Sequence, residues 1–240
     1  MKRFACFLSL ILAMILIVAA VPFVNAAPAL PADLQDPGAW YYSDAVFCYT
    51  FSIMVGDEFG NFNPMKEISR AELVTIMARL LYPGYEDMSD EAFGALLNTV
   101  WAGTGSDPFE LPPVSFEEDL PYFADTEGKW FERGATLMAA AGVVSGRGDG
   151  TFDGEAPITR QELAVLLKGA INNEQTFGES KTFSDLDAAA SWAHDAVVWA
   201  GTCGLFQGSE GKFMPLNKAT RAEIAVLIGT FRSVFLPDPT

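Results

Sequence analysis

Apolar residues recur with helical spacing in three stretches of the chain, and each stretch opens with the same short pattern, Ser/Thr-Arg-x-Glu. The three openings are residues 69–72, 159–162 and 220–223. After each opening the apolar positions fall three or four residues apart, so they lie on one face of a helix. The pattern therefore predicts three amphipathic helices, which begin at Arg70, Arg160 and Arg221.

The opening pattern has the composition of a capping box. The Ser or Thr hydroxyl accepts from the N3 amide, and the Glu side chain accepts from the amide of the capping residue. The arginine is not explained in this way, because a cation in the first helical turn opposes the helix dipole and costs roughly 0.3–1 kcal/mol. Its repetition indicates that each arginine has another partner.

Two partners fit such an arginine. A forked guanidinium beside free helix amides suits an anion such as a carboxylate or a phosphate. The alternative is an internal ion pair with an aspartate of the same repeat or of a neighbouring one.

Further landmarks recur at fixed distances before each arginine. A glycine lies ten residues upstream, a phenylalanine eight and a tryptophan about thirty: Gly60, Gly150, Gly211; Phe62, Phe152, Phe213; Trp40, Trp130, Trp192. Self-similarity at a fixed period is typical of a repeat protein. The chain is therefore predicted to hold three repeats, over residues 33–82, 123–173 and 183–236, each with a helix, a turn-rich loop and a second helix.

Residues 83–122 interrupt the array with an acidic insertion. The segment has nine acidic residues and no Lys or Arg. Ser89 is a candidate cap for a helix that would carry an apolar stripe of Phe93, Leu96, Leu97, Val100 and Trp101. This helix is expected to pack on the repeats, and the proline-rich residues 107–121 to form a loop.

The first 26 residues are typical of a secretory signal peptide. Lys2 and Arg3 precede an apolar run that Pro22 ends, and small residues follow at Asn25-Ala26. An uncleaved membrane anchor is the competing interpretation. Cleavage after residue 26 would leave no stable membrane insertion.

Charge and composition exclude several classes of function. The formal charge of −16 becomes −18 without Lys2 and Arg3, which argues against nucleic acid as a partner. One histidine, His194, and no Cys/His cluster leave no basis for a nucleophilic triad or a zinc site. No cofactor, metal or enzymatic activity is therefore predicted. Cys48 and Cys203 are expected to be either paired or buried as free thiols.

The landmarks together resemble the S-layer homology (SLH) family. The motifs are Phe-x-Asp at 123–125 and 183–185, the tryptophans, Gly-x-x-x-Gly-x-Phe, and Thr-Arg-x-Glu. The resemblance implies an all-α fold in which three helix–loop–helix repeats close into one pseudo-threefold domain with grooves between neighbours.

The resemblance also implies a function. Such domains anchor exported proteins non-covalently to a bacterial secondary cell-wall polysaccharide, commonly one that carries pyruvate ketals. A secreted protein of the cell wall or S-layer is thus expected. The alternative is a surface structural module that contacts other surface proteins, with its arginines in internal ion pairs.

Carried over by position, the resemblance assigns ligand-binding roles to four groups of residues. The arginines would hold a ligand carboxylate, the tryptophans would wall the grooves, the aspartates would bind sugar hydroxyls or fix the arginines, and the glycines would let ligand approach the backbone. These residues are Arg70, Arg160, Arg221; Trp40, Trp130, Trp192; Asp125, Asp185; Gly56, Gly146, Gly208. Core packing is the alternative for the tryptophans.

The chain departs from the family pattern in a few places. Repeat one has Leu34-Gln35-Asp36 in place of Phe-x-Asp, and Ser69 in place of Thr. Repeat three has Ser209-Glu210-Gly211 in its loop. The insertion is also placed where it would cover one groove.

Overall fold

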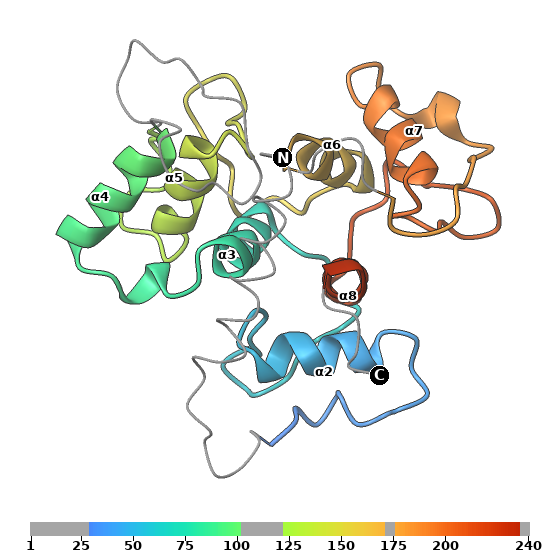
Figure 1. The fold of residues 1–240 in the computed structure, drawn as a ribbon, viewed down its shortest axis with the longest axis horizontal. Coiled ribbons are helices and arrows are strands. Elements are labelled where there is room, and N and C mark those ends of the chain that lie inside the picture. The colour runs from blue at the N-terminus through green and yellow to red at the C-terminus, as the bar shows by residue number, and fades with distance from the viewer. Residues whose placement is uncertain (1–28, 102–121, 171–175, 236–240) are drawn as a thin grey trace. The chain divides into compact units, whose positions relative to one another are not determined.

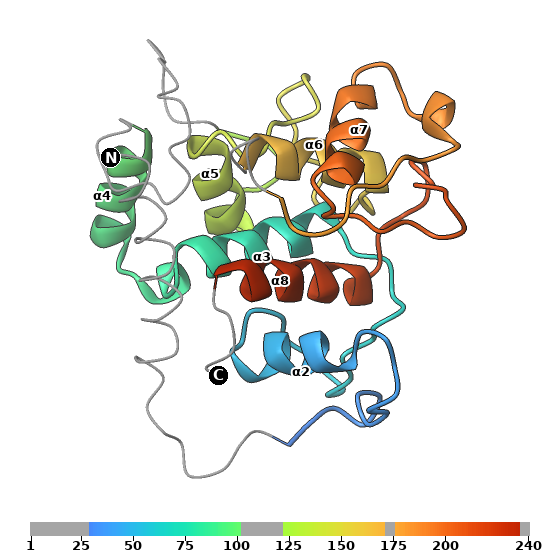
Figure 2. The same cartoon turned by 45° about the vertical axis from the view of Figure 1, so that its right-hand side comes forward.

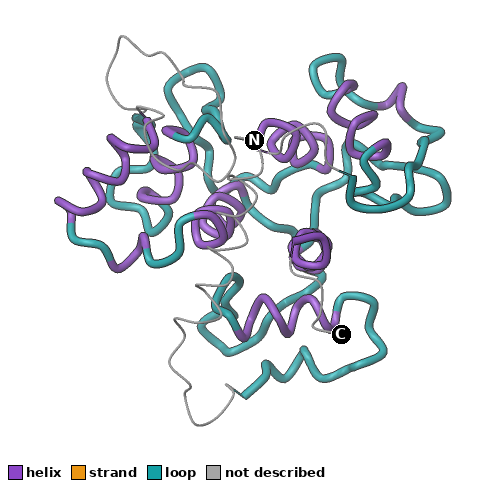
Figure 3. The backbone as a smooth tube through the Cα atoms, viewed as in Figure 1, coloured by secondary structure: helices purple, strands orange, loops and turns teal. Residues whose placement is uncertain are grey.

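A computed structural model describes residues 29–101, 122–170 and 176–235. Within these ranges the chain forms α-helices joined by long loops and short 3₁₀ turns, with isolated bridges in place of strands (Figures 1 and 3). The predicted all-α class is confirmed. The predicted signal peptide and the predicted 107–121 loop lie outside the described residues.

The chain divides into two compact units. Among the described residues, the first unit comprises 69–101, 122–156 and 166–170, and the second comprises 29–68, 157–165 and 176–235. The helix α6 (Arg160–Ala170) has residues in both.

The first unit is built around α5 (Glu132–Ala140), which packs against α3 (Arg70–Leu81) and α4 (Asp90–Trp101) (Figure 1). The α3–α5 contact is close, because a Cβ atom at Gly134 would lie 3.4 Å from the Cα of Thr75. A 3₁₀ turn, η1 (Tyr85–Asp87), links α3 to α4.

The α4 helix confirms the predicted helix of the insertion and its docking on a repeat. Phe93 and Leu97 are buried, while the side chains of Val100 and Trp101 lie outside the described set. Arg133 of α5 holds the start of α4: its Nη1 donates to the Met88 carbonyl at 2.7 Å, and its Nη2 contacts Asp90 at 2.5 Å. Its guanidinium also lies 4.9 Å from the centroid of the Phe93 ring.

The second unit contains α2 (Tyr42–Thr50), η2 (Leu186–Ala188), α7 (His194–Thr202) and α8 (Arg221–Phe235). Helices α2 and α8 pack against each other, as Figure 2 shows. Gly229 of α8 permits this contact, since a Cβ atom there would overlap the carboxylate of Asp44. Cys48 and Cys203 are buried free thiols, so they do not form the disulfide that the sequence left open.

The three predicted helix starts are confirmed, since α3, α6 and α8 begin at the three arginines. Each capping residue receives the N3 amide on its hydroxyl, at 3.1, 3.3 and 3.3 Å, and donates its own amide to the N3 glutamate at 2.9, 2.8 and 2.8 Å: Ser69 with Glu72, Thr159 with Glu162, Thr220 with Glu223. The capping box is therefore formed in all three repeats.

The residues that precede the three caps form a closed ring of backbone hydrogen bonds. Ile68 donates to Ala219 at 2.9 Å, Ala219 donates to Ile158 at 2.9 Å, and Ile158 donates to Ile68 at 3.1 Å. The pseudo-threefold closure of the whole domain stays a prediction. Among the described residues, no helix is both long and apolar enough to cross a membrane.

The first helices of the repeats end in the left-handed conformation, which glycine adopts most easily. Gly142 (φ +69°) follows the end of α5 and Gly204 (φ +75°) follows the end of α7, but Ser52 (φ +55°) takes this position after α2. The left-handed conformation costs a residue with a side chain roughly 1–2 kcal/mol, partly offset by the lower entropy of its unfolded chain.

Ser52→Gly should therefore raise the free energy of unfolding by roughly 0.5–1 kcal/mol. Chemical denaturation followed by circular dichroism measures this change. The matched control is the reverse substitution at the equivalent exposed position, Gly142→Ser, which should lower stability by a similar amount. Equal effects of the same sign would contradict the explanation.

Candidate functional site

Each predicted site arginine reaches from its helix start to the loop of another repeat. Its Nε donates to the carbonyl of the landmark phenylalanine: Arg70 to Phe152 at 3.0 Å, Arg160 to Phe213 at 2.7 Å, Arg221 to Phe62 at 2.8 Å. The guanidinium lies over the ring of the same phenylalanine, 4.8, 5.2 and 5.0 Å from its centroid in that order. This dual contact compensates the unfavourable position of a cation in a first helical turn.

The helix amides beside each arginine are also in use. The amide of Arg160 donates to Asn217 at 2.9 Å and that of Gln161 to Pro215 at 3.0 Å, and the corresponding amides of α3 and α8 have carbonyl partners of the same kind. The anion site expected from free helix amides is therefore reduced to the guanidinium groups.

The phenylalanine loops are held by aspartates. Asp125 accepts the amides of Phe152 and Asp153, both at 2.7 Å, and Asp185 accepts those of Phe213 and Met214 at 2.7 and 2.8 Å. The two predicted site aspartates thus fix the arginines indirectly, through the carbonyl that each arginine contacts.

In repeat one the same role belongs to Asp33, which accepts Phe62 and Asn63 at 2.8 and 2.6 Å. The alignment of Leu34-Gln35-Asp36 with Phe-x-Asp is wrong, since the carboxylate of Asp36 caps only the nearby amide of Gly38. The spacing from the tryptophan would have found Asp33, which precedes Trp40 by the seven residues that separate Asp185 from Trp192.

The loop conformation explains how two successive amides reach one carboxylate. The residue after each phenylalanine is left-handed although it is not glycine: Asn63 (φ +55°), Asp153 (φ +58°) and Met214 (φ +58°). Successive amides in such a turn converge on an anion. Burial raises the pKa of Asp125, but the amides of Phe152 and Asp153 outweigh it and hold that pKa below its ordinary value.

The three guanidinium groups differ in their remaining contacts. Arg70 Nη2 donates to the Ser145 carbonyl at 3.1 Å, and Arg221 Nη2 to the Val55 carbonyl at 2.6 Å. Arg160 pairs through Nη1 with Glu223, whose other oxygen caps α8. The internal ion pair left open by the sequence is therefore present at Arg160, with a glutamate in place of the expected aspartate.

The remaining nitrogen of Arg160, Nη2, has no hydrogen-bond partner within the described part of the chain, although the residue is only 6% exposed. The loop of repeat three explains this difference. From its first glycine to its phenylalanine it is one residue shorter than the loops of the other repeats, and that glycine, Gly208, is left-handed (φ +65°). The carbonyl of Gln207, which corresponds to those of Ser145 and Val55, does not accept from Arg160 in the described part of the chain.

The three predicted site tryptophans are exposed, so the core alternative is wrong. Their exposed fractions are 61% for Trp40, 61% for Trp130 and 59% for Trp192. Each lies two residues before the first helix of its repeat. An exposed indole thus lies at the same place in all three repeats, and its contact with a ligand stays a prediction.

The predicted site glycines are explained by internal packing. A Cβ atom at Gly146 would lie 2.5 Å from the Thr151 carbonyl oxygen and 2.8 Å from the ring of Phe123. At Gly208 the equivalent clashes are with Lys212 and Phe183, and at Gly56 a Cβ atom would lie 3.1 Å from the Asn61 carbonyl oxygen. Ligand approach at these glycines stays a prediction.

The sequence analysis did not assign the phenylalanine landmarks a role in positioning the arginines. Phe62, Phe152 and Phe213 are completely buried, and each supplies both the ring and the carbonyl that position an arginine. Their constant distance of eight residues before the arginines was the available signal.

Comparison with known proteins agrees with this architecture. The family model of the S-layer homology domain matches residues 35–74, 122–164 and 182–225, which lie almost wholly within the three predicted repeats. The chain belongs to the S-layer homology family. This SLH chain is 26% identical over 204 residues to the S-layer protein sap of Bacillus anthracis, covering 84% of this chain and 20% of that protein.

Two further relatives are a surface-layer protein and an enzyme. The surface-layer 125 kDa protein of Lysinibacillus sphaericus is 31% identical over half of this chain and 13% of its own length. An amylopullulanase of Thermoanaerobacterium thermosulfurigenes is 25% identical over 70% of this chain and 8% of its own length. The SLH chain thus spans about a fifth or less of these relatives.

Replacement of Asp125 tests the loop clamp. Asp125→Asn should lower the free energy of unfolding by about 2 kcal/mol. The Asn side chain has an NH2 donor in place of one carboxylate oxygen, so one backbone amide of the loop loses its acceptor and the other loses a charged one. Urea denaturation measures the change. Asp36→Asn, which affects a carboxylate with a single local contact, is the control and should be close to neutral.

The stability difference between wild type and Asp125→Asn is also expected to depend on pH. Because folding lowers the pKa of Asp125, its contribution is complete well above pH 4 and declines as the pH falls below the ordinary Asp value of about 3.9. The stability difference between wild type and Asp125→Asn should therefore shrink in acid. A difference that stays constant from pH 7 to pH 2.5 would contradict the clamp.

Proposed function

We propose that this chain is a secreted module that attaches to the bacterial cell surface by binding an acidic secondary cell-wall polysaccharide. Family membership and relatives named as S-layer proteins support the surface location. The named relatives also include an amylopullulanase and an endoglucanase, so the segment that they share with this chain accompanies different activities. Attachment, and not catalysis, is the role that suits a shared segment of this kind.

The observation that carries the ligand chemistry is the Nη2 of Arg160, which remains accessible to solvent although its residue is only 6% exposed, and which has no acceptor in the described parts of the chain. A ligand acceptor that replaces solvent at this donor forms a hydrogen bond to a charged group, which contributes roughly 1.5–3 kcal/mol. The carboxylate of a pyruvate ketal on the polysaccharide is such an acceptor, and it forms a charge-assisted hydrogen bond with guanidinium.

The exposed tryptophans supply the second part of this proposal. An indole face adds apolar contact to a sugar ring, while the arginine reads the acid group. Arg70 and Arg221 are proposed to contribute less, because their Nη2 groups already donate to loop carbonyls. Asp125 and Asp185 are proposed to act through the loops that they hold.

A surface structural module is the second candidate, and the Arg160–Glu223 ion pair favours it. In this alternative the arginines join the repeats, and the acidic insertion with α4 contacts another surface protein. The two candidates differ in what Glu223 does to a ligand: a competing carboxylate weakens the binding of an acidic polymer, whereas a purely structural pair has no such effect.

Two substitutions separate these candidates. Arg160→Lys removes the forked donor, and it should weaken cosedimentation with purified wall polysaccharide about tenfold or more. Glu223→Gln keeps a capping-box residue but frees the guanidinium, so it should strengthen binding. Arg79→Lys, at an arginine paired with Glu86 away from the loops, is the control.

The polymer itself gives the second arm of the experiment. Removal of the ketal pyruvate should abolish cosedimentation of the wild-type protein. Undiminished binding to depyruvylated walls would refute the acidic ligand. If Arg160→Lys and Glu223→Gln both lower stability in denaturation but leave cosedimentation unchanged, the structural alternative is correct.

A further inference from the structure

The backbone amide two residues before each of the three predicted site tryptophans donates to a side chain. The donor–acceptor distance is 2.9 Å in every repeat: Gly38 to Asp36, Gly128 to Glu132, Ala190 to Gln161. The tryptophan follows directly in a tight turn, so the acceptor at this amide helps to set where the turn and its indole lie. The three repeats differ in where this acceptor comes from.

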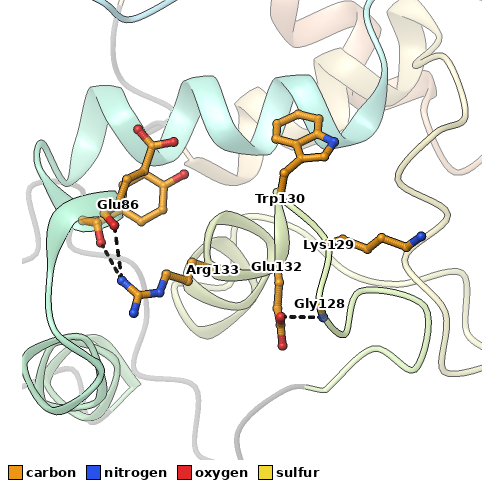
Figure 4. Close-up of a pocket in the computed structure, with 7 residues that line it drawn as sticks. Glu86, Gly128, Lys129, Trp130, Glu132 and Arg133 are labelled. Carbon is orange, nitrogen blue, oxygen red and sulfur yellow. Dashed lines mark hydrogen bonds between the residues drawn. The ribbon is translucent and has the colours of Figure 1, made fainter.

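In repeats one and two the acceptor is local. Each lies within four residues of the amide that it binds. Figure 4 shows the bond between Glu132 and Gly128 beside Trp130, with Glu86 of the insertion on the opposite side of a pocket. These two tryptophan turns are therefore held from within their own repeats.

In repeat three the acceptor comes from the preceding repeat. Gln161 is the second residue of α6 and directly follows Arg160. It lies 29 residues before Ala190, within the same second unit. Gln161 is only 6% exposed, and Oε1 is the one atom of its side chain that can accept from an amide, so this bond fixes the orientation of the side chain.

A second hydrogen bond continues the connection from Ala190 to the tryptophan. The carbonyl of Ala190 accepts from the amide of Ala193 at 2.9 Å, which closes the turn that carries Trp192. This turn begins two residues before its tryptophan, whereas the corresponding turns of the other repeats begin one residue before theirs. The bond from Gln161 thus joins the turn of Trp192 to the helix start that carries Arg160.

The site arginines of repeats one and three are not followed by such an acceptor. The next residue is alanine in both, Ala71 and Ala222, and each is completely buried. A methyl group cannot accept a hydrogen bond, so neither helix start can hold a tryptophan turn in this way. The same comparison shows that this position of the helix accommodates alanine.

We infer that Gln161 is a positioning residue, which holds the turn of Trp192 at the start of α6 and so fixes the indole relative to Arg160. An indole that is held before ligand binds does not have to be ordered in the complex, so less affinity is lost to entropy. The inference rests on the proposed function for the ligand that these two side chains bind. The positioning itself does not depend on that ligand.

Amide hydrogen exchange measured by NMR tests the positioning without a ligand. In Gln161→Ala the amide of Ala190 loses its acceptor, so its exchange should become at least about tenfold faster. Gln161→Glu keeps an acceptor oxygen and should restore the protection. Gly128, whose acceptor belongs to its own repeat, is the control and should exchange equally in all three proteins. Unchanged exchange of Ala190 in Gln161→Ala would overturn the inference.

A double-mutant cycle tests the effect on binding. Gln161→Ala should weaken cosedimentation with pyruvylated wall polysaccharide roughly threefold to tenfold. The combined variant with Trp192→Ala should bind no more weakly than Trp192→Ala alone, because Gln161 acts through Trp192. Combination with Trp40→Ala, at a tryptophan whose turn is held locally, should give the product of the two separate losses.

The two experiments separate the inference from the proposed function. A combined Gln161→Ala and Trp192→Ala variant that binds more weakly than Trp192→Ala would overturn the positioning role, since a general loss of stability acts independently of the indole. A wild-type protein that fails to cosediment would refute the proposed function alone. The exchange of Ala190 would then still decide whether Gln161 holds the turn.

Discussion

In each repeat one aspartate accepts hydrogen bonds from two successive backbone amides of the loop, and the rest of the site depends on this pair of bonds. Asp33, Asp125 and Asp185 each fix a left-handed turn that a bulky residue would otherwise avoid. The fixed turn presents the carbonyl of a buried phenylalanine to the arginine of another repeat. Removal of the carboxylate would leave two amides without an acceptor and the arginine without a defined position.

This chain of contacts turns a local capping motif into a connection between repeats. The glutamate of Thr-Arg-x-Glu caps its own helix, and at Glu223 it also neutralises the arginine of the preceding repeat. A single residue thus stabilises a helix start and orients the guanidinium of another repeat. The ring formed by Ile68, Ala219 and Ile158 connects the same three positions through the backbone.

The repeats are alike in framework but differ in what they leave open. The loop of repeat three is one residue shorter and Nη2 of Arg160 has no acceptor in the described part of the chain, whereas the insertion gives repeat two a second wall beside its exposed tryptophan. The aspartate clamp and the capping box are present in all three repeats.

The sequence by itself determined the three helix starts and the amphipathic helix of the insertion. These features depend on spacing along the chain: the capping box spans four residues, and an apolar stripe repeats every three or four. It also pointed to the arginines as residues with distant partners, because their local position is unfavourable.

Only the tertiary structure decided which partners the three arginines have. Three features depend on atoms from segments that are far apart in the chain. They are the role of Asp33 in place of Asp36, the pairing of Arg160 with Glu223, and the exposure of the three tryptophans. Burial and hydrogen-bond geometry arise when such segments pack, and no local pattern encodes them.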